Sequence, residues 1–195
     1  MRWTFHPPHA YHIRQPTPTG TAAPMSQHLH IDPFAGVAGD MFLGACVDLG
    51  ATLDAIAAAI RPLPIAQSWD LTTRRVTRHN LTAIDLKVEL REHEHAGHHT
   101  HSDDAGAAAV RHDHHHHHAH YRDIAAMVDR LDAPDRARER ARKILRLLGE
   151  AEAGVHGIAL DDVHFHEVGA VDSIVDMFGA AIAVELLDVE TVSCG

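Results

Sequence analysis

The chain has 195 residues, 45% of them hydrophobic, which is enough to bury the core of one domain, or of one domain with a small appendage. Its 27 acidic and 17 basic residues give a net charge of −10 with histidine neutral, which argues against a general nucleic-acid binder and is compatible with cation binding. Cys46 and Cys194 lie far apart, and no apolar run approaches about 20 residues. We therefore expect no disulfide framework, no zinc finger and no transmembrane helix, and we predict a cytoplasmic protein.

Residues 1–27 hold five of the nine prolines and have no continuous apolar core. They are predicted to form a disordered leader and not a signal peptide. Because order is expected from residue 28, we interpret Met25 as the true start codon. Residues 28–32 are predicted to form a strand, followed by a glycine-bearing loop and a helix that runs from Asp40 to Gly50. The apolar positions with helical spacing on this helix are Met41, Phe42, Ala45, Cys46 and Leu49.

The middle of the chain changes from helical to alternating periodicity. A short helix is expected over residues 53–61, ahead of two prolines. Residues 69–90 are predicted to form two paired strands with the turn near His79 and Asn80, because apolar and polar residues alternate in the second half of this segment. Residues 91–120 have low complexity and are predicted to be a flexible insertion.

Helical spacing returns in the last third of the chain. Residues 124–131 carry one apolar stripe, and a longer helix is expected from Pro134 to Gly157. A final helix is predicted from Ala170, with a closing strand over residues 190–194. The positions predicted to face the core are Ala137, Ala141, Ile144, Leu145, Leu148, Val171, Ile174, Val175, Phe178 and Ile182. Strands interleaved with about five helices indicate an α/β or α+β layered domain over residues 28–195.

The insertion contains a tract of twelve histidines. Neutral imidazole is a good ligand for nickel, zinc and copper, and many loosely placed imidazoles favour a high-capacity, exchangeable site. The tract is internal and its longest run is five, which argues against a purification tag. It therefore predicts metal binding without selecting the metal. Its members are His93, His95, His98, His99, His101, His112, His114, His115, His116, His117, His118 and His120.

A second group of candidate ligands lies in the stretch VHFHEVGAVDSIVD, residues 163–176. His164 and His166 share one face if the segment is extended, and Glu167 follows directly. Asp172 and Asp176 are spaced i, i+4 on the next helix, where like charges repel unless a cation or a donor lies between them. Interaction with the helix dipole explains Asp172 well and Asp176 poorly. We interpret the stretch as a metal, nucleotide or substrate site.

The loop in HIDPFAGVAGDM is a candidate phosphate site. Asp32 ends a strand, Gly36 and Gly39 loosen the loop, and the helix that begins at Asp40 presents free N–H groups. The segment has neither a Walker A sequence nor a GxGxxG fingerprint, so a plain tight turn is an equal alternative. His79 and His156 are expected to be surface or core residues and not ligands.

Four blocks resemble the N-terminal half of the LarC family of nickel insertion proteins: HIDPFAGVAGDMFLGACVDLGA, the histidine-rich insertion, HYRDIAAMVD with RKILRLLGEAEAGVHG, and VHFHEVGAVDSIVDMFGAA. The resemblance implies a cyclometallase of the lyase class that makes the nickel-pincer cofactor of lactate racemase. Nickel enters pyridinium-3,5-bisthiocarboxylic acid mononucleotide through one nickel–carbon bond and nickel–sulfur bonds. CTP and Mg²⁺ or Mn²⁺ are required in the family.

The motif positions of the family carry over to Asp32, Gly36, Gly39 and Asp40 in the first block, and to His164, His166, Glu167, Asp172, Ser173 and Asp176 in the last. We divide the candidates among them into three groups. The catalytic candidates are His166, Glu167, Asp172 and Asp176. The substrate-phosphate candidates are Asp32, Gly36, Gly39 and Asp40. The metal candidates are His164, His166, Glu167 and the tract. Because a ring proton must be removed, a base is needed, and Glu167, Asp172 and His166 all fit that role.

The resemblance also implies a partner. The chain stops at Gly195, whereas the family continues into a second half to which CTP binding is attributed and which some members encode in a separate reading frame. We expect that half, and proteins of the lactate racemase pathway, as partners. Two alternatives stay open: a non-catalytic nickel store or chaperone, which does not explain the carboxylates at 172 and 176, and a hydrolase or nucleotide-binding enzyme that uses this cluster for Mg²⁺ or Zn²⁺.

Overall fold

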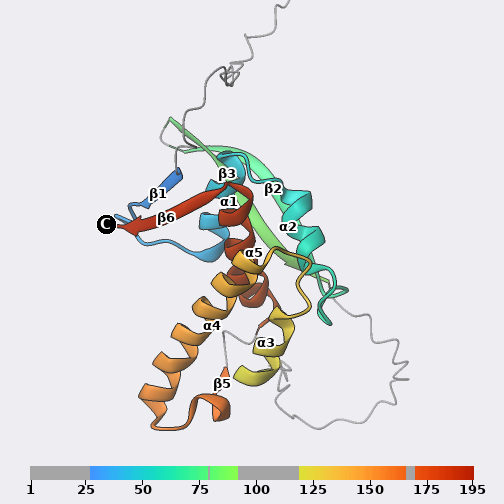
Figure 1. Ribbon diagram of the computed structural model, residues 1–195. Helices are drawn as coiled ribbons and strands as arrows, with labels where there is room; N and C mark the ends of the chain where they lie inside the picture. Colours follow the sequence, from blue (N-terminus) through green and yellow to red (C-terminus); the bar gives the residue numbers. More distant parts are fainter. Residues whose placement is uncertain (1–26, 79, 92–118, 166–169) are drawn as a thin grey trace, which may run out of the picture.

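A computed structural model describes residues 27–78, 80–91, 119–165 and 170–195 (Figure 1). Most of the predicted leader, the histidine tract up to residue 118, and His166 and Glu167 lie outside these ranges. The elements are β1 (Gln27–Ile31), α1 (Gly39–Asp48), α2 (Leu53–Ile60), β2 (Trp69–Arg78), β3 (Leu81–Leu90), β4 (Ala119–His120), α3 (Tyr121–Val128), α4 (Asp135–His156), the 3₁₀ helix η1 (Leu160–Asp162), β5 (His164–Phe165), α5 (Val171–Leu186) and β6 (Val189–Cys194).

The predicted mixed α/β class is confirmed, with five α-helices in the described ranges. The strands form three separate pairs: β1 with β6 in parallel, and β2 with β3 and β4 with β5 in antiparallel orientation. Several predicted boundaries differ from the observed ones by one or two residues. Gln27 belongs to β1 and not to the leader, and Ala119 and His120 form β4 and not the end of the flexible insertion, because they pair with β5.

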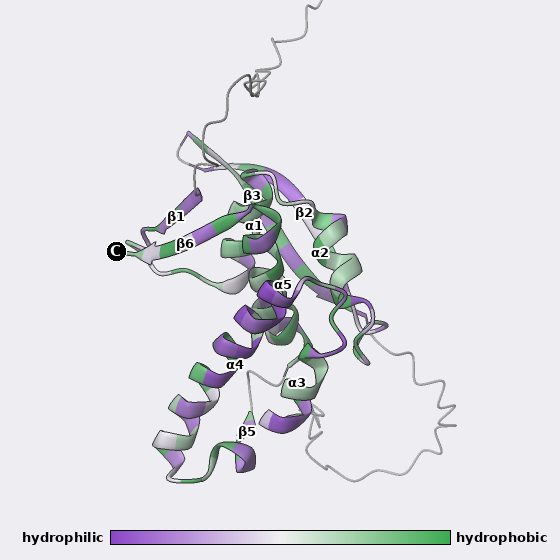
Figure 2. Ribbon diagram, viewed as in Figure 1, coloured by the Kyte–Doolittle hydropathy of each residue, from purple (hydrophilic) through white to green (hydrophobic). Residues whose placement is uncertain are grey.

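Helix α5 is the centre of the core. It packs against α1, α2, α4 and β3 (Figure 1), and Figure 2 shows it as largely hydrophobic. A helix that is apolar on nearly all sides is stable only when other elements surround it. The predicted burial of Ile174, Val175, Phe178 and Ile182 is confirmed, and Val171 at the start of the helix is half-buried.

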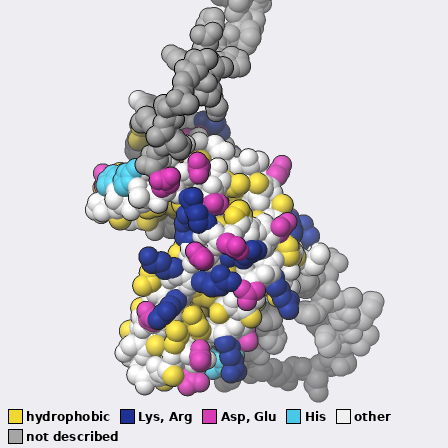
Figure 3. All heavy atoms as spheres, viewed as in Figure 1, with side chains coloured by type: hydrophobic (Ala, Val, Ile, Leu, Met, Phe, Trp, Pro, Cys, Tyr) yellow, Lys and Arg dark blue, Asp and Glu magenta, His cyan; other side chains and the backbone are white. Residues whose placement is uncertain are grey.

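Helix α4 covers one side of α5 and has the predicted limits. Pro134 precedes its first turn, and Gly157 ends it in the left-handed conformation with φ of +66°. Ala137, Ala141 and Leu145 are buried. The opposite face carries basic and acidic side chains exposed to solvent (Figure 3), so the helix is amphipathic.

The predicted strand pair of residues 69–90 is confirmed as a regular hairpin, with Trp69 opposite Leu90 and Arg78 opposite Leu81. Asn80 has φ of +63°, a conformation that tight hairpin turns require. The hairpin lies against α1 at Gly44. A Cβ atom built on Gly44 would lie 2.5 Å from the backbone oxygen of Ile84, so only a glycine permits this approach.

Replacing Gly44 by alanine is expected to destabilise the fold by about 1–3 kcal/mol, because the obstructing atom is backbone and cannot rotate away. Gly154 is the matched control, since a Cβ atom there meets nothing within 4 Å and alanine in an open helix position is expected to stabilise by about 0.5–1 kcal/mol. Urea unfolding of both variants measures the difference. Equal stability of Gly44→Ala and Gly154→Ala would contradict the observed packing of α1 on β3.

The apolar positions with helical spacing on α1 are only partly buried. Met41 is 58% exposed, Leu49 just past the helix is 62% exposed, and Ala45 is also exposed, whereas Leu43, Gly44 and Cys46 are buried. The sequence GDMFLGACVD is apolar on two sides, so spacing alone did not reveal which side α5 and β3 would cover. An exposed apolar surface on α1 follows.

No helix in the described ranges is long and apolar enough to span a bilayer. Cys46 is a buried thiol and Cys194 an exposed one, and they are not joined, as the sequence predicted. The cytoplasmic location stays a prediction. His156 is exposed beside Glu152, 3.5 Å away, which confirms its expected place on the surface.

Candidate functional site

The N-terminal ends of α1 and α5 lie together in the fold, and each carries an aspartate at its second residue. Asp40 Oδ1 accepts a hydrogen bond of 2.7 Å from the backbone N–H of Met41. Asp172 Oδ1 accepts one of 2.8 Å from the N–H of Ser173. Both carboxylates are stabilised by the partial positive charge of a helix N-terminus, so each has a structural explanation of its own.

Asp176 has no such explanation within its own helix. It lies one turn beyond Asp172 and packs against the first residue of α1, where a Cβ atom built on Gly39 would lie 2.5 Å from Asp176 Oδ2. Among the described residues, the buried Oδ1 of Asp176 has no hydrogen-bond partner. Burial, and then the charges of Asp40 and Asp172, raise the pKa of Asp176 to about 6.

The three aspartates line one pocket of about 260 Å³, which we call the carboxylate pocket. Its remaining lining comes from Lys87 and Val88 of β3. Three carboxylates facing one ammonium group give the pocket a net negative charge, which attracts cations. In the part of the chain that the structure describes, no group of three or more His, Cys, Asp or Glu side chains is already arranged to hold a metal ion.

Asp176 also lines a second cavity, of about 380 Å³, beside the N-terminus of α1. We call it the apolar cleft, since Ser173 and Asp176 are its only polar side chains among the lining residues. The apolar side chains come from α4, α5 and the start of α1: Val37, Ala38, Phe42, Ile144, Leu148, Met177 and Ala180. The wall from α4 consists of residues that the helical pattern predicted to face inward.

This arrangement suits proton transfer. A carboxylate with a pKa near 6 is mostly ionised at neutral pH and is a stronger base than an ordinary aspartate. Asp176 joins an apolar cavity, which fits a planar ring, to a negatively charged one, which fits a cation. Perturbed carboxylates at the edge of a cavity mark candidate functional sites.

The four predicted phosphate-site residues are divided between two places. Gly39 and Asp40 lie with Asp172 and Asp176, which the sequence placed in a separate group. Asp32 and Gly36 line another groove, where the N–H of Gly36 donates to the carbonyl oxygen of Pro33 at 2.8 Å and closes a turn. Carboxylates now surround the end of α1, which is unfavourable for a phosphate group. The phosphate role of these residues stays a prediction.

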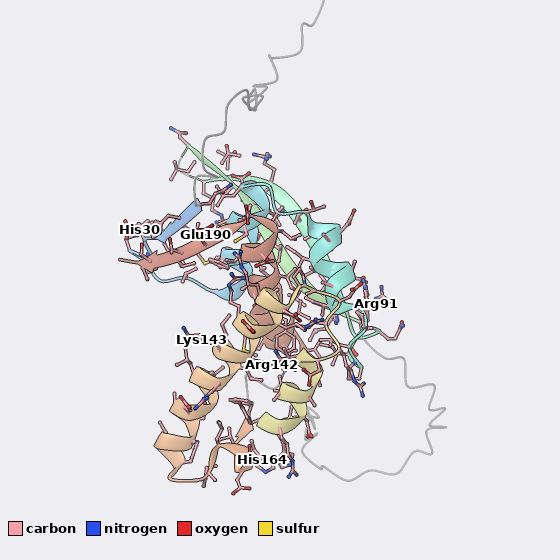
Figure 4. The ribbon with its side chains drawn as sticks, viewed as in Figure 1. His30, Arg91, Arg142, Lys143, His164 and Glu190 are labelled. Atoms are coloured by element: carbon pink, nitrogen blue, oxygen red, sulfur yellow. The ribbon has the colours of Figure 1, made fainter. Side chains whose placement is uncertain are left out.

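Two of the predicted metal ligands meet in the β4–β5 pair. His120 lies opposite His164, with ring centroids 3.7 Å apart and ring planes tilted by 50° (Figure 4 labels His164). Nδ1 of His120 is buried and has no hydrogen-bond partner among the described residues. We call these residues the histidine pair. His166, Glu167 and the other tract histidines lie outside the described ranges.

Sequence reasoning did not find Lys87 or the apolar cleft. Lys87 is one of several charged residues in an alternating strand, and such residues usually face solvent. Met177 and Ala180 of the cleft belong to an apolar helix in which no residue stands out. Only the i, i+4 spacing of the two aspartates carried a signal for this site.

Comparison with known proteins identifies the family of the chain. Residues 29–195 match the family described as nickel insertion protein. The chain belongs to this nickel insertion family. The resemblance drawn from the sequence motifs is thereby confirmed.

Three relatives illustrate the similarity. The pyridinium-3,5-bisthiocarboxylic acid mononucleotide nickel insertion protein of Staphylococcus epidermidis (strain ATCC 12228 / FDA PCI 1200) is 36% identical over 170 residues, 87% of this chain and 37% of the relative. Putative nickel insertion proteins of Myxococcus xanthus and Geobacter sulfurreducens are 42% and 39% identical, over 84% and 86% of this chain and 37% and 38% of theirs. The chain therefore spans less than two fifths of these relatives. No solved structure matches.

Proposed function

We propose that this chain takes part in inserting nickel into pyridinium-3,5-bisthiocarboxylic acid mononucleotide, the compound in the printed name of the Staphylococcus epidermidis relative. The product is the nickel-pincer cofactor of lactate racemase. The observation that carries the proposal is the position of Asp176 between the apolar cleft and the carboxylate pocket. A nickel-inserting enzyme of the lyase class needs both a place for an aromatic ring and a base beside it.

The apolar cleft is assigned to the pyridinium ring, with the ring proton directed at Asp176. In the reaction the ring C–H bond breaks, its electron pair forms the nickel–carbon bond, and the proton passes to a carboxylate oxygen of Asp176. Nickel stays divalent, so no oxidant or reductant is required. The negative charge of Asp40 and Asp172 favours the approach of the cation and keeps the pKa of Asp176 raised.

Nickel is the cargo of this reaction, and its final ligands come from the substrate. In the product, nickel is coordinated by the ring carbon and by the sulfur atoms of the two thiocarboxylates, so the protein holds the ion only during transfer. The absence of a ready metal site in the described ranges is compatible with this role. The tract of residues 93–120 and the histidine pair are assigned to collecting nickel before insertion.

The CTP and Mg²⁺ or Mn²⁺ that the family resemblance implies are not assigned to this part of the chain. The described residues contain no Walker A or GxGxxG loop and no assembled carboxylate site for Mg²⁺ or Mn²⁺. We place both with the part of the relatives that this chain does not match, and no step above involves them.

Deleting residues 93–118 is expected to remove most of the bound nickel, because the deletion takes away eleven imidazoles and leaves β4 in place. With the unmatched part of a relative supplied, the nickel-loaded product should still form at high Ni²⁺ if the tract is a feeder. Nickel content by atomic absorption and product by mass spectrometry are the two measurements. Failure to form product with the undeleted chain under any condition would favour the alternative of a nickel store.

A further inference from the structure

A second apolar depression lies away from the site, between β1 and α1. It has a volume of about 360 Å³, and we call it the β1–α1 groove. Its larger apolar side chains include Leu29, Ile31, Phe34, Met41, Phe42 and Leu49, and its polar lining residues are His30 and Asp32. Phe34 is 94% exposed, and Met41 and Leu49 are each more than half exposed. Large apolar side chains gathered around one groove indicate a binding surface.

The strand pair above the groove is only partly covered. Parallel strands are normally buried on both faces by helices, yet most residues of β1 and β6 are exposed or half-exposed. Figure 1 shows the two strands at one edge of the molecule, with the end of the chain beside them. Each strand has one partner among the described residues, so each leaves an edge unpaired.

The two faces of this strand pair differ in chemistry. On one face, the ring of His28 is hydrogen-bonded to the hydroxyl of Thr191 at 2.7 Å and to that of Ser193 at 2.9 Å. The ring of His30 is hydrogen-bonded to the same Ser193 hydroxyl at 2.7 Å. Histidine side chains accordingly gather at this corner in Figure 3, and Figure 4 labels His30 there. That face is polar and suits water. The alternate residues Leu29 and Ile31 give the groove its apolar wall from β1, and His30 and Asp32 also belong to its lining.

We propose that the β1–α1 groove binds an amphipathic helix from the part of the nickel insertion family's polypeptide that this chain does not match. More than half of each relative described above lies outside the match, so the family has ample chain to supply it. A helix is the element that covers an apolar face of parallel strands. The carbonyl oxygen of Ile31, a lining residue of the groove, accepts a hydrogen bond of 2.9 Å from the N–H of Gly195.

The test uses the unmatched region of the Myxococcus xanthus relative, produced as a separate polypeptide and titrated into this chain by calorimetry. We expect a one-to-one complex that Met41→Asp weakens by at least about tenfold, because a charge then enters the apolar contact. Leu49→Asp is a second variant on the same groove. Leu147→Asp is the matched control, since Leu147 is a 59% exposed leucine on α4 that does not line the groove.

Three results would overturn this inference. One is no binding to the folded wild-type chain at micromolar concentrations. Another is equal loss of binding in Met41→Asp and Leu147→Asp, or no loss in Met41→Asp and Leu49→Asp. The third is a doubled mass of the chain alone in light scattering, reduced to one chain by Met41→Asp, which would show that a second copy fills the groove. Circular dichroism of each variant separates lost binding from lost folding.

Discussion

Asp176→Asn is expected to lower the rate of nickel insertion by about 10²- to 10⁴-fold, the usual contribution of a general base. Asparagine has nearly the same shape but cannot take the ring proton. The rate is measured as formation of the nickel-loaded product with the unmatched part of a relative present. Asp54→Asn is the matched control, because Asp54 is an exposed aspartate in the first turn of α2 and outside the site.

The same variant should be at least as stable as the wild type at neutral pH. The pKa of Asp176 rises from 3.8 to about 6 on folding, so the ionised carboxylate is disfavoured in the native state. The contribution of Asp176 to the free energy of unfolding is therefore highest below pH 3.8, and it is lost as the pH rises through 6. Above pH 6 the melting temperature of Asp176→Asn should be higher than that of the wild type, and the difference should disappear near pH 4. An unfolded variant would indicate a structural role instead.

Gly39→Ala is expected to have the second largest effect, acting on Asp176 without touching its chemistry. The added Cβ atom would lie 2.5 Å from Oδ2 and 2.6 Å from Cβ of Asp176, so the side chain or the helix must move. We expect a loss of about 1–3 kcal/mol in the free energy of unfolding, and at least about a tenfold loss of rate from the displaced base.

Two comparisons make this second experiment decisive. Gly154→Ala controls for the general effect of alanine in a helix, because it has open space around it. Gly44→Ala controls for lost stability, since it disturbs α1 against β3 and not against Asp176. Nickel insertion at a temperature where all variants are folded is the measurement. Gly39→Ala with wild-type rate and stability would show that Asp176 does not depend on this contact.

Sequence periodicity predicted those elements whose structure is determined by residues close together in the chain. Helix α4 and the β2–β3 hairpin were predicted with nearly their observed limits, because both are amphipathic and have clear ends at Gly157 and Asn80. The buried face of α1 could not be predicted in this way. Met41 and Leu43 are both apolar, and only tertiary packing determines that Leu43 is buried and Met41 exposed. The parallel pairing of β1 with β6 joins opposite ends of the chain and leaves no local pattern.

The candidate site shows the same division. The i, i+4 pair of Asp172 and Asp176 was visible in the sequence as charge on a helix built for burial. The contact of Asp176 with Gly39 was not visible in the sequence. These residues lie far apart in the chain, and they meet only because the N-terminal ends of α1 and α5 lie together in the fold. The sequence indicated Glu167, Asp172 and His166 as the base, whereas the burial of Asp176 in the fold favours Asp176.

The dependence of the insertion rate on pH tests the central claim, that Asp176 accepts the ring proton, most directly. Single-turnover formation of the nickel-loaded product is measured by mass spectrometry from pH 4 to 7 at saturating Ni²⁺. For the wild type we predict a rate that rises about tenfold per pH unit and levels off above pH 6, as the carboxylate ionises. The residual rate of Asp176→Asn should lack this inflection. A wild-type rate independent of pH from 4 to 7, or the same inflection in Asp176→Asn, would contradict the account.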